Sequence, residues 1–211
     1  MGERSAIRLV VLDRDGTINE DRDDYVKSPE EWVPIPGALE AIARLHQAGW
    51  HVVVATNQSG LGRGLFDMYT LNEMHLKMNA LLAPLGGKVD AVFFCPHAPD
   101  DGCTCRKPAP GLFHKIGERY KVDLKLVHAV GNSLADVQAA QAAGCVPHLV
   151  LTGRHAPAAD QALPPAYPAA TRLHADLAAF ATAFIAEQEA AAEALAALAP
   201  GTAPAGVAAA P

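Results

Sequence analysis

The sequence has no apolar run that approaches the roughly 20 residues needed for a membrane-spanning helix. The amino terminus lacks an apolar signal segment, because Met-Gly-Glu-Arg-Ser leads directly into the first predicted strand. Basic residues are also scarce: 17 lysines and arginines stand against 23 acidic residues, for a net charge of −6. Non-specific nucleic-acid binding needs a basic surface, so this charge argues against it. We therefore expect a cytoplasmic protein with no membrane partner and no nucleic-acid partner.

No internal repeat divides the 211 residues, and half of them are hydrophobic. A chain of this length can bury one core, so a single domain is expected over residues 1–198. Within that domain, residues 153–198 supply a loop and a C-terminal helix. The Ala/Pro-rich tail at residues 199–211 is expected to be disordered. We expect the protein to be a monomer.

Hydrophobic runs of strand length alternate with stretches of helical periodicity along the chain. The predicted strands are residues 9–12, the run that starts at residue 50, and residues 89–94, 126–130 and 147–151. Helices are expected to begin near residues 36, 70, 110, 137 and 175. This alternation predicts an α/β fold of Rossmann-like type, with a parallel sheet and helices on both faces.

Two carboxylates follow the first strand directly, in the sequence Asp13-Arg14-Asp15-Gly16-Thr17. Aspartate and glycine are depleted in strands, so the carboxylates lie at the carboxyl end of the strand, where open α/β sheets bind ligands. Neighbouring carboxylates repel each other unless a cation joins them, and a divalent metal is the simplest such cation. An ionised aspartate beside a metal can also attack phosphorus. The alternative for the Asp-x-Asp pair alone is an acidic turn without a function.

The longer pattern Asp-x-Asp-Gly-Thr after a hydrophobic strand resembles the first motif of the haloacid-dehalogenase-like phosphatases. The resemblance implies that Asp13 is the nucleophile and Asp15 the general acid/base. It also implies Mg²⁺ as a cofactor, held by the Asp13 carboxylate and the Asp15 backbone carbonyl. No insertion in this chain is long enough to form the large cap domain that some members carry.

The second strand ends in small polar residues, with the sequence Thr-Asn-Gln-Ser-Gly-Leu-Gly-Arg-Gly from Thr56 onward. Taken alone, it is equally consistent with an anion site built from backbone N–H groups and with an ordinary strand-to-helix loop. It is similar to the second motif of a sugar-phosphate branch of the same superfamily. That resemblance implies phosphate contacts from Thr56 and Asn57 and a positive charge at Arg63. Small loops would then select the substrate, and their candidate residues are Asp21, Arg22, Asp23, Asp24, Tyr25, Asn57, Gln58, Ser59, Arg63, Arg106 and Ser133.

Three cysteines and a histidine lie close together in one Pro/Gly/Asp-rich loop: Cys95, His97, Cys103 and Cys105. Four nitrogen and sulfur ligands match a closed tetrahedral zinc site, which is structural rather than catalytic. The loop has little apolar content of its own, so a bound metal would replace the missing core. The alternatives are free thiols or a disulfide, and disulfides are rare in the cytoplasm. The fourth cysteine, Cys145, is expected to be a small core residue.

The predicted zinc loop is followed at once by Arg106 and Lys107. We infer that the metal holds these two cations in place, because a floppy loop would lose effective molarity at the phosphate. In the superfamily a lysine in this third motif neutralises the phosphoryl group being transferred, which implies that role for Lys107. Arg106 can bind two phosphate oxygens at once. The alternative is a solvated basic pair.

The fourth motif departs from the superfamily pattern. There the strand ends in Gly-Asp and that aspartate ligates magnesium, whereas here the matching residue is Asn132. An amide oxygen can still coordinate a hard cation but brings no negative charge, so we expect weaker metal binding. Asp136 is the candidate to compensate, as an acid behind the metal ligands or as a ligand itself.

The motifs together predict a magnesium-dependent phosphatase that acts on a small phosphorylated sugar. Related histidinol-phosphatases share the second motif, the zinc-ligand loop and Arg-Lys-Pro, so histidinol phosphate or another small phosphate monoester is the alternative substrate. A third interpretation, suggested only by Asn132, is a catalytically weakened binding protein.

Overall fold

A computed structural model describes residues 7–154, 156–157 and 162–198 of the chain. Its centre is a six-stranded parallel sheet with the strand order β3-β2-β1-β4-β5-β6. The strands are β1 (Leu9–Leu12), β2 (His51–Asn57), β3 (Ala91–Cys95), β4 (His128–Gly131), β5 (Val146–Val150) and β6 (Arg172–His174). The prediction of a parallel Rossmann-like α/β fold is confirmed, with one strand more than the sequence indicated.

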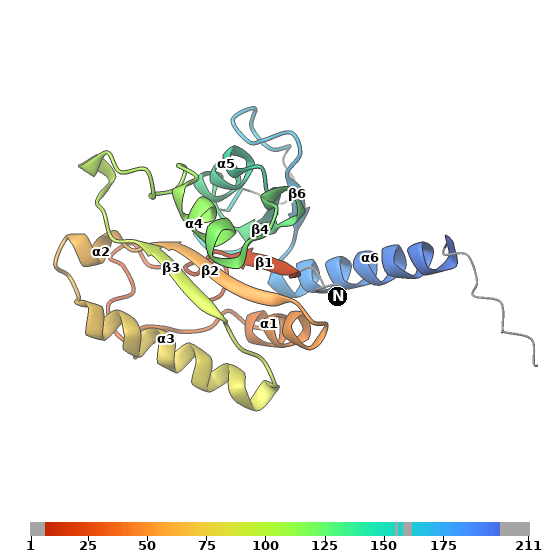
Figure 1. Cartoon of the computed structure of the whole chain (residues 1–211). Helices are drawn as coiled ribbons and strands as arrows, with labels where there is room; N and C mark the ends of the chain where they lie inside the picture. The colour runs from red at the N-terminus through yellow and green to blue at the C-terminus, as the bar shows by residue number, and fades with distance from the viewer. Residues whose placement is uncertain (1–6, 155, 158–161, 199–211) are drawn as a thin grey trace, which may run out of the picture.

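Helices cover both faces of this sheet. The helices are α1 (Ala38–Gln47), α2 (Ser59–Gly62), α3 (Met68–Leu82), α4 (Gly111–Tyr120), α5 (Leu134–Ala143) and α6 (Leu177–Leu198), with 3-10 turns η1 (Ala83–Leu85), η2 (Pro99–Asp101) and η3 (Leu124–Leu126). Figure 1 shows α1 and α3 below the sheet and α4 and α5 above it. Helix α6 packs beside α1 on the lower face, and its Phe180 and Phe184 pack against His148 and Trp50. Among the described residues, no helix is both long and apolar enough to cross a membrane.

The side-chain alternation of β1 divides the core between the two faces. Val10 and Leu12 belong to the cluster under α1, α3 and α6, and Leu9 and Val11 belong to the cluster under α4. All four side chains are at most 1% exposed. A strand buried on both faces reads as a continuous apolar run, as this one does.

The strand order places β1 beside both β2 and β4. Leu12 is in register with Val54 on one side and with Val130 on the other. The chain segments that follow these strands therefore emerge together at one edge of the sheet. The order reverses between β1 and β4, and such switch points are where open α/β sheets bind ligands.

The C-terminal region is more structured than its composition indicated. The described parts of residues 153–170, predicted as loop, contain no helix or strand, but β6 follows at once and pairs with β5. Helix α6 begins at Leu177, where the Asp176 carboxylate accepts the Ala179 N–H at 2.7 Å. Its C-terminal half projects away from the sheet (Figure 1). The predicted disordered tail at residues 199–211 lies outside the described residues.

Candidate active site

The first motif forms a tight turn at the end of β1. The Asp13 N–H donates to the Val130 carbonyl at 2.8 Å, so the ladder with β4 extends one residue beyond the strand. Gly16 then takes φ +83°, and a Cβ at this position would lie 2.2 Å from Asn132 Nδ2. Only glycine permits both this conformation and this close approach. The turn therefore brings the first motif against Asn132, the residue that follows β4.

Lys107 joins the carboxylates of two separate motifs. Its ammonium lies 2.6 Å from Asp13 Oδ1, 2.6 Å from Asp136 Oδ1 and 2.7 Å from the Ala55 carbonyl. The residue is only 4% exposed. Burial acts to lower the pKa of Lys107, but Asp13 and Asp136 outweigh it and raise the pKa above its ordinary value. A lysine that arrives 94 residues after Asp13 is thus held as a cation beside it.

Asp13 is the carboxylate whose charge is least stabilised in this site. Its burial and the nearby Asp136 raise the pKa of Asp13 to about 7, although Lys107 opposes them. Only Oδ1 of Asp13 has a hydrogen-bond partner among the described side chains. The other oxygen remains for a metal ion or for attack on phosphorus, and a bound cation would favour the ionised form.

Asp15 has the opposite environment. Burial would raise the pKa of Asp15, but Arg14 and the amides of Asn19 and Gln58 outweigh it and lower the pKa. Arg14 Nη2 lies 2.9 Å from both carboxylate oxygens, and Gln58 Nε2 lies 2.7 Å from Oδ2. These environments favour the ionised form of Asp15 and disfavour that of Asp13.

A cavity of about 190 Å³ opens at this edge of the sheet. Its lining is almost entirely polar or charged: Asp13, Asp15, Asp21, Arg22, Asn57, Lys107, Asn132, Ser133 and Asp136. All nine were candidate site residues in the sequence analysis. The fold therefore brings the candidates from all four motifs and the loop at residues 21–25 to one place.

Several of these polar side chains bond to other site residues. Both polar atoms of the Asn57 amide bond to the backbone of Lys107. Gln58 Nε2 is shared between Asp15 and Thr56 Oγ1. The Ser133 hydroxyl donates to Asp136 Oδ2 at 2.6 Å. In this arrangement these side chains hold the site together, whereas the resemblance assigned Asn57, Gln58 and Ser133 to substrate binding.

The loop at residues 21–25 is fixed from one side by Arg154. The Arg154 backbone N–H donates to the Asp21 carboxylate at 3.1 Å, and its guanidinium pairs with Asp23. Arg154 follows β5, so the pairing connects the substrate loop to the other half of the sheet.

From the other side, the Arg63 guanidinium lies 5.8 Å from the centre of the Tyr25 ring, within the range of a cation–π contact. Arg22 pairs with Asp24 at 3.2 Å within the loop. Tyr25 has φ +69°, which is rare for a residue with a Cβ. The loop at residues 21–25 therefore has a defined shape at the cavity mouth.

Asn132 reaches into the cavity from the end of β4. It is 3% exposed, and the Thr17 hydroxyl lies 3.5 Å from its Oδ1. Both oxygens of Asp136 already have partners, since Lys107 contacts Oδ1 and the Ser133 N–H and hydroxyl donate to Oδ2. Asp13 and Asn132 offer side-chain oxygens at the cavity, and oxygen ligands are those that Mg²⁺ prefers. Asp136 thus contacts Lys107, the same ammonium that contacts Asp13.

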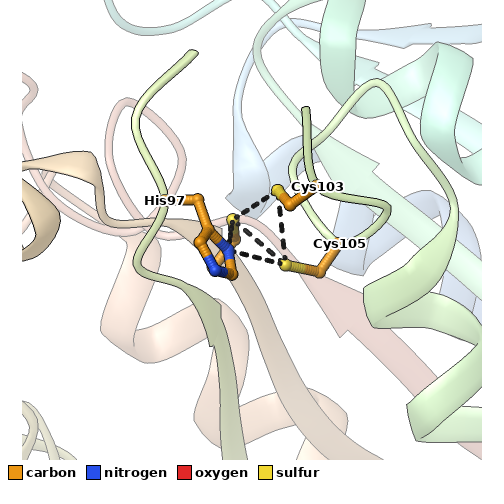
Figure 2. A group of neighbouring side chains, drawn as sticks. His97, Cys103 and Cys105 are labelled. Carbon is orange, nitrogen blue, oxygen red and sulfur yellow. Dashed lines mark hydrogen bonds between the residues drawn. The ribbon is translucent and has the colours of Figure 1, made fainter. Parts of the chain in front are cut away.

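The four predicted zinc ligands converge in space. Figure 2 shows His97, Cys103 and Cys105 with their side chains pointing toward one another. The ligand atoms of Cys95, His97, Cys103 and Cys105 all lie within 4.8 Å of one another, and the cysteines form no disulfide. Five of the six separations between these atoms run from 3.3 to 3.6 Å. The edges of a tetrahedron around zinc are about 3.4–3.8 Å for ligand bonds of this kind, so the cluster has the size of a zinc site.

The cysteine–histidine loop contacts the active site through two connections. Cys105 leads through Arg106 directly to Lys107, and an Arg106 Nη1 lies 3.4 Å from the His97 carbonyl. The Cys95 carbonyl accepts the Gln58 N–H at 2.7 Å. The loop therefore anchors both the lysine on Asp13 and the glutamine on Asp15.

Residues 18–144 match the family model described as haloacid dehalogenase-like hydrolase. The chain belongs to the haloacid dehalogenase-like hydrolases. One curated member, D-glycero-beta-D-manno-heptose-1,7-bisphosphate 7-phosphatase of Bordetella bronchiseptica, is 56% identical over 181 residues, which is 86% of this chain and 99% of the relative. The protein of the same name from Pseudomonas aeruginosa is 51% identical over 177 residues, 84% of this chain and 97% of the relative.

Solved structures of haloacid dehalogenase-like hydrolases agree with this fold. D,D-heptose 1.7-bisphosphate phosphatase from B. bronchiseptica, complexed with magnesium and phosphate, superimposes with a TM-score of 0.79 at 53% identity and covers 86% of this chain and 99% of its own. The corresponding protein from Burkholderia thailandensis gives a TM-score of 0.62 at 46% identity, with 84% of this chain and 98% of its own covered.

In this haloacid dehalogenase-like hydrolase, sequence analysis missed two arginines at the site. Arg14 lies between Asp13 and Asp15 in the sequence. In a regular strand its side chain would point to the face opposite the two carboxylates. Its burial and its pairing with Asp15 are visible only once the turn is known. Arg154 lies after β5 in a segment with no motif of its own. Both arginines could have been predicted from one physical requirement: a cavity lined by several carboxylates needs positive charge nearby.

Proposed function

We propose that the protein removes the 7-phosphate of D-glycero-D-manno-heptose 1,7-bisphosphate through an aspartyl-phosphate on Asp13. The observation that carries the proposal is the Asp13–Lys107–Asp136 arrangement at the cavity floor, with Asp15 beside it. Support for the substrate comes from relatives of that name at 51–56% identity, which match this chain over almost their entire length. The four motifs and the cysteine–histidine loop also resemble those of the heptose bisphosphate phosphatases. A cytoplasmic monomer is part of the proposal.

In the first step, the free oxygen of Asp13 attacks the phosphorus at C7. The bond between phosphorus and the sugar oxygen breaks, and Asp15 gives its proton to that oxygen. Lys107 remains beside the reacting carboxylate, where its charge stabilises the negative charge on the phosphoryl oxygens. Thr56, buried beside Gln58, is the candidate to bind one of those oxygens.

In the second step, water attacks the phosphorus of the aspartyl-phosphate. Asp15 takes a proton from this water, the bond between phosphorus and Asp13 breaks, and inorganic phosphate leaves. Asp15 thus ends the cycle protonated again, with a proton from water in place of the one that left on the sugar. One residue thus serves both half-reactions, which requires that its carboxyl group stay in place.

The proposed cofactor is Mg²⁺, held by the Asp13 carboxylate, the Asp15 backbone carbonyl and Asn132. When bound, the ion supplies positive charge for the phosphoryl oxygens and favours the ionised form of Asp13. The oxygen donors at the cavity fit such a cation. The structure of the B. bronchiseptica relative complexed with magnesium and phosphate supports the same assignment.

The second proposed metal is a structural Zn²⁺ at Cys95, His97, Cys103 and Cys105. Its support is the tetrahedral size of the cluster and the lack of a disulfide among the three cysteines. Bound zinc would order the loop that carries Arg106 and Lys107. Arg106 borders a surface hollow of about 360 Å³ that Lys107 joins to the cavity at Asp13, so Arg106 is placed to contact the rest of the substrate.

The test is release of inorganic phosphate from a panel that includes the heptose bisphosphate and histidinol phosphate, with Mg²⁺ or with a chelator. We expect kcat/KM for the heptose bisphosphate to exceed that for histidinol phosphate by about 100-fold, and activity to disappear with the chelator. Asp13→Asn should reduce turnover to background. A preference for histidinol phosphate would replace the substrate assignment. No release from any ester would favour a binding protein instead.

A further inference from the structure

Three side chains donate hydrogen bonds to the Asp15 carboxylate. Arg14 approaches both of its oxygens, with Nη2 at 2.9 Å and Nε at 3.2 Å. Asn19 Nδ2 donates to Oδ1 at 2.9 Å, and Gln58 Nε2 donates to Oδ2 at 2.7 Å. Because donors approach both oxygens, they restrain rotation of the carboxyl group.

These donors are not equivalent. The Asn19 amide is shared with the Glu20 carbonyl at 2.8 Å, and the Gln58 amide is shared with Thr56 at 2.9 Å. Arg14 directs both Nε and Nη2 to Asp15 alone. Each of these two nitrogens lies equally far from both carboxylate oxygens, so the rigid, planar guanidinium faces the carboxylate as a unit and fixes its position.

Arg14 is itself held in place. Its side chain is 1% exposed, whereas that of Asp15 is 26% exposed. Its third nitrogen, Nη1, lies 3.4 Å from His75 Nε2 on α3. Burial and the neighbouring Arg14 charge lower the pKa of His75 to about 4, so the imidazole is neutral at pH 7 and accepts a hydrogen bond from Arg14. Helix α3 thus supports the guanidinium from below while its fork faces Asp15.

We propose that Arg14 is a positioning residue, whose buried guanidinium fork holds the Asp15 carboxyl group where it meets the oxygen leaving phosphorus. This inference rests on the proposed phosphatase function. It assigns Arg14 no contact with the substrate: the effect passes through Asp15. A displacement of about 1 Å in a group that transfers a proton can cost about 100-fold in rate.

Positioning of Asp15 affects leaving groups unequally. A sugar alkoxide must be protonated as it departs, so it needs Asp15 in place. A p-nitrophenolate is stable as an anion and departs without a proton. The ratio of kcat/KM for the sugar phosphate to kcat/KM for p-nitrophenyl phosphate therefore reports on proton donation in the first step, because kcat/KM excludes the later hydrolysis of the aspartyl-phosphate.

The experiment compares the wild-type holoenzyme with Arg14→Met and Arg14→Lys. We expect Arg14→Met to lower kcat/KM for the heptose bisphosphate at least tenfold more than for p-nitrophenyl phosphate. The inhibition constant for inorganic phosphate should change less than threefold. Arg14→Lys keeps the charge but lacks the fork, so the substrate ratio should fall at least threefold. If Arg14→Met does not fold, the lysine variant decides.

Arg8→Met is the matched control, because the Arg8 guanidinium lies over Trp50, 4.4 Å from the ring centre, at the opposite end of β1. It should keep both rates within twofold. Equal losses on both esters, or a parallel loss of phosphate inhibition, would refute the positioning role. If the wild type hydrolyses only the sugar phosphate, the inhibition constant for phosphate decides: a lower rate with an unchanged constant supports the positioning role, and a parallel loss refutes it. If it hydrolyses neither ester, the proposed function itself fails and this inference falls with it.

Discussion

Asn57, at the end of β2, holds the backbone of Lys107 on both sides. Its Oδ1 accepts the Lys107 N–H at 3.0 Å, and its Nδ2 donates to the Lys107 carbonyl at 3.1 Å. The lysine thus reaches Asp13 from a loop whose backbone is bonded to a strand of the central sheet. Removal of this amide would leave both backbone groups of Lys107 without partners.

We expect Asn57→Ala to lower kcat about 10- to 100-fold, because Lys107 then lies less accurately beside the phosphoryl group. Steady-state rates with Mg²⁺ measure the effect. The matched control is Asn79→Ala on α3, where Asn79 Oδ1 accepts the Val89 N–H at 3.1 Å. The control removes a similar amide–backbone bond away from the site, so it should lower stability but leave kcat unchanged. Equal rate losses in the two variants would contradict the role of Asn57.

Cys103→Ser should remove both zinc and activity. Three remaining ligands bind the metal far more weakly than four, and without the metal the loop no longer fixes Arg106 and Lys107. Metal content by mass spectrometry and phosphate release are measured on the same sample. Cys145→Ser is the control: this buried thiol, whose pKa is raised to about 12 by burial, belongs to the core under α4. Full activity in a zinc-free Cys103→Ser protein would disprove the positioning idea.

The sequence predicted the architecture because its strands are apolar runs that end in turn residues. Residues 9–12 match β1 in full, and the parallel order then follows from the alternation of strands and helices. Strand β6 was missed because it is three residues long, mostly exposed, and has one apolar residue, Leu173. Such a segment has no periodicity, and only its pairing with β5 makes it a strand.

The sequence predicted which residues would meet at the cavity, but it did not predict their hydrogen-bond partners. The superfamily resemblance predicted that Asp13, Lys107 and Asn132 belong to one site, although they are far apart in the sequence. In the structure all three line the same cavity. The sequence could not tell whether a polar side chain would face a ligand or another side chain. Ser133 and Gln58 illustrate this, since both are bonded to a carboxylate of the site.

Asn132→Asp should tighten magnesium binding. It adds a negative charge at the cavity where Asn132 now offers a neutral oxygen, and we expect the dissociation constant for Mg²⁺ to fall about tenfold. Calorimetric titration with MgCl₂ measures this without substrate. Asn79→Asp adds the same charge on α3, where the new carboxylate can still accept the Val89 N–H, and should leave magnesium affinity unchanged. An unaltered affinity and rate in Asn132→Asp would rule out this account of the residue.

The last prediction concerns the three histidines on β4, β5 and β6. His148 is 1% exposed, and its ring nitrogens lie 2.9 Å from His128 Nδ1 and 3.0 Å from His174 Nε2. Burial, together with its neighbours His128, His174 and Arg172, lowers the pKa of His148 to about 2. In the unfolded chain His148 therefore binds a proton as the pH falls below about 6.5, whereas in the folded chain it stays neutral. This contribution to stability is complete above about pH 6.5 and is lost as the pH falls below it.

At pH 5 the loss from His148 alone is about 2 kcal/mol relative to pH 7.5. His148→Gln lacks the titrating group, so its free energy of unfolding should fall less between these pH values, by about that amount. Urea unfolding at pH 7.5 and pH 5 measures both proteins. His114→Gln, at an exposed position on α4, is the control and should keep the wild-type pH response. If wild type and His148→Gln lose the same stability on acidification, the buried imidazole is not what makes the fold sensitive to acid.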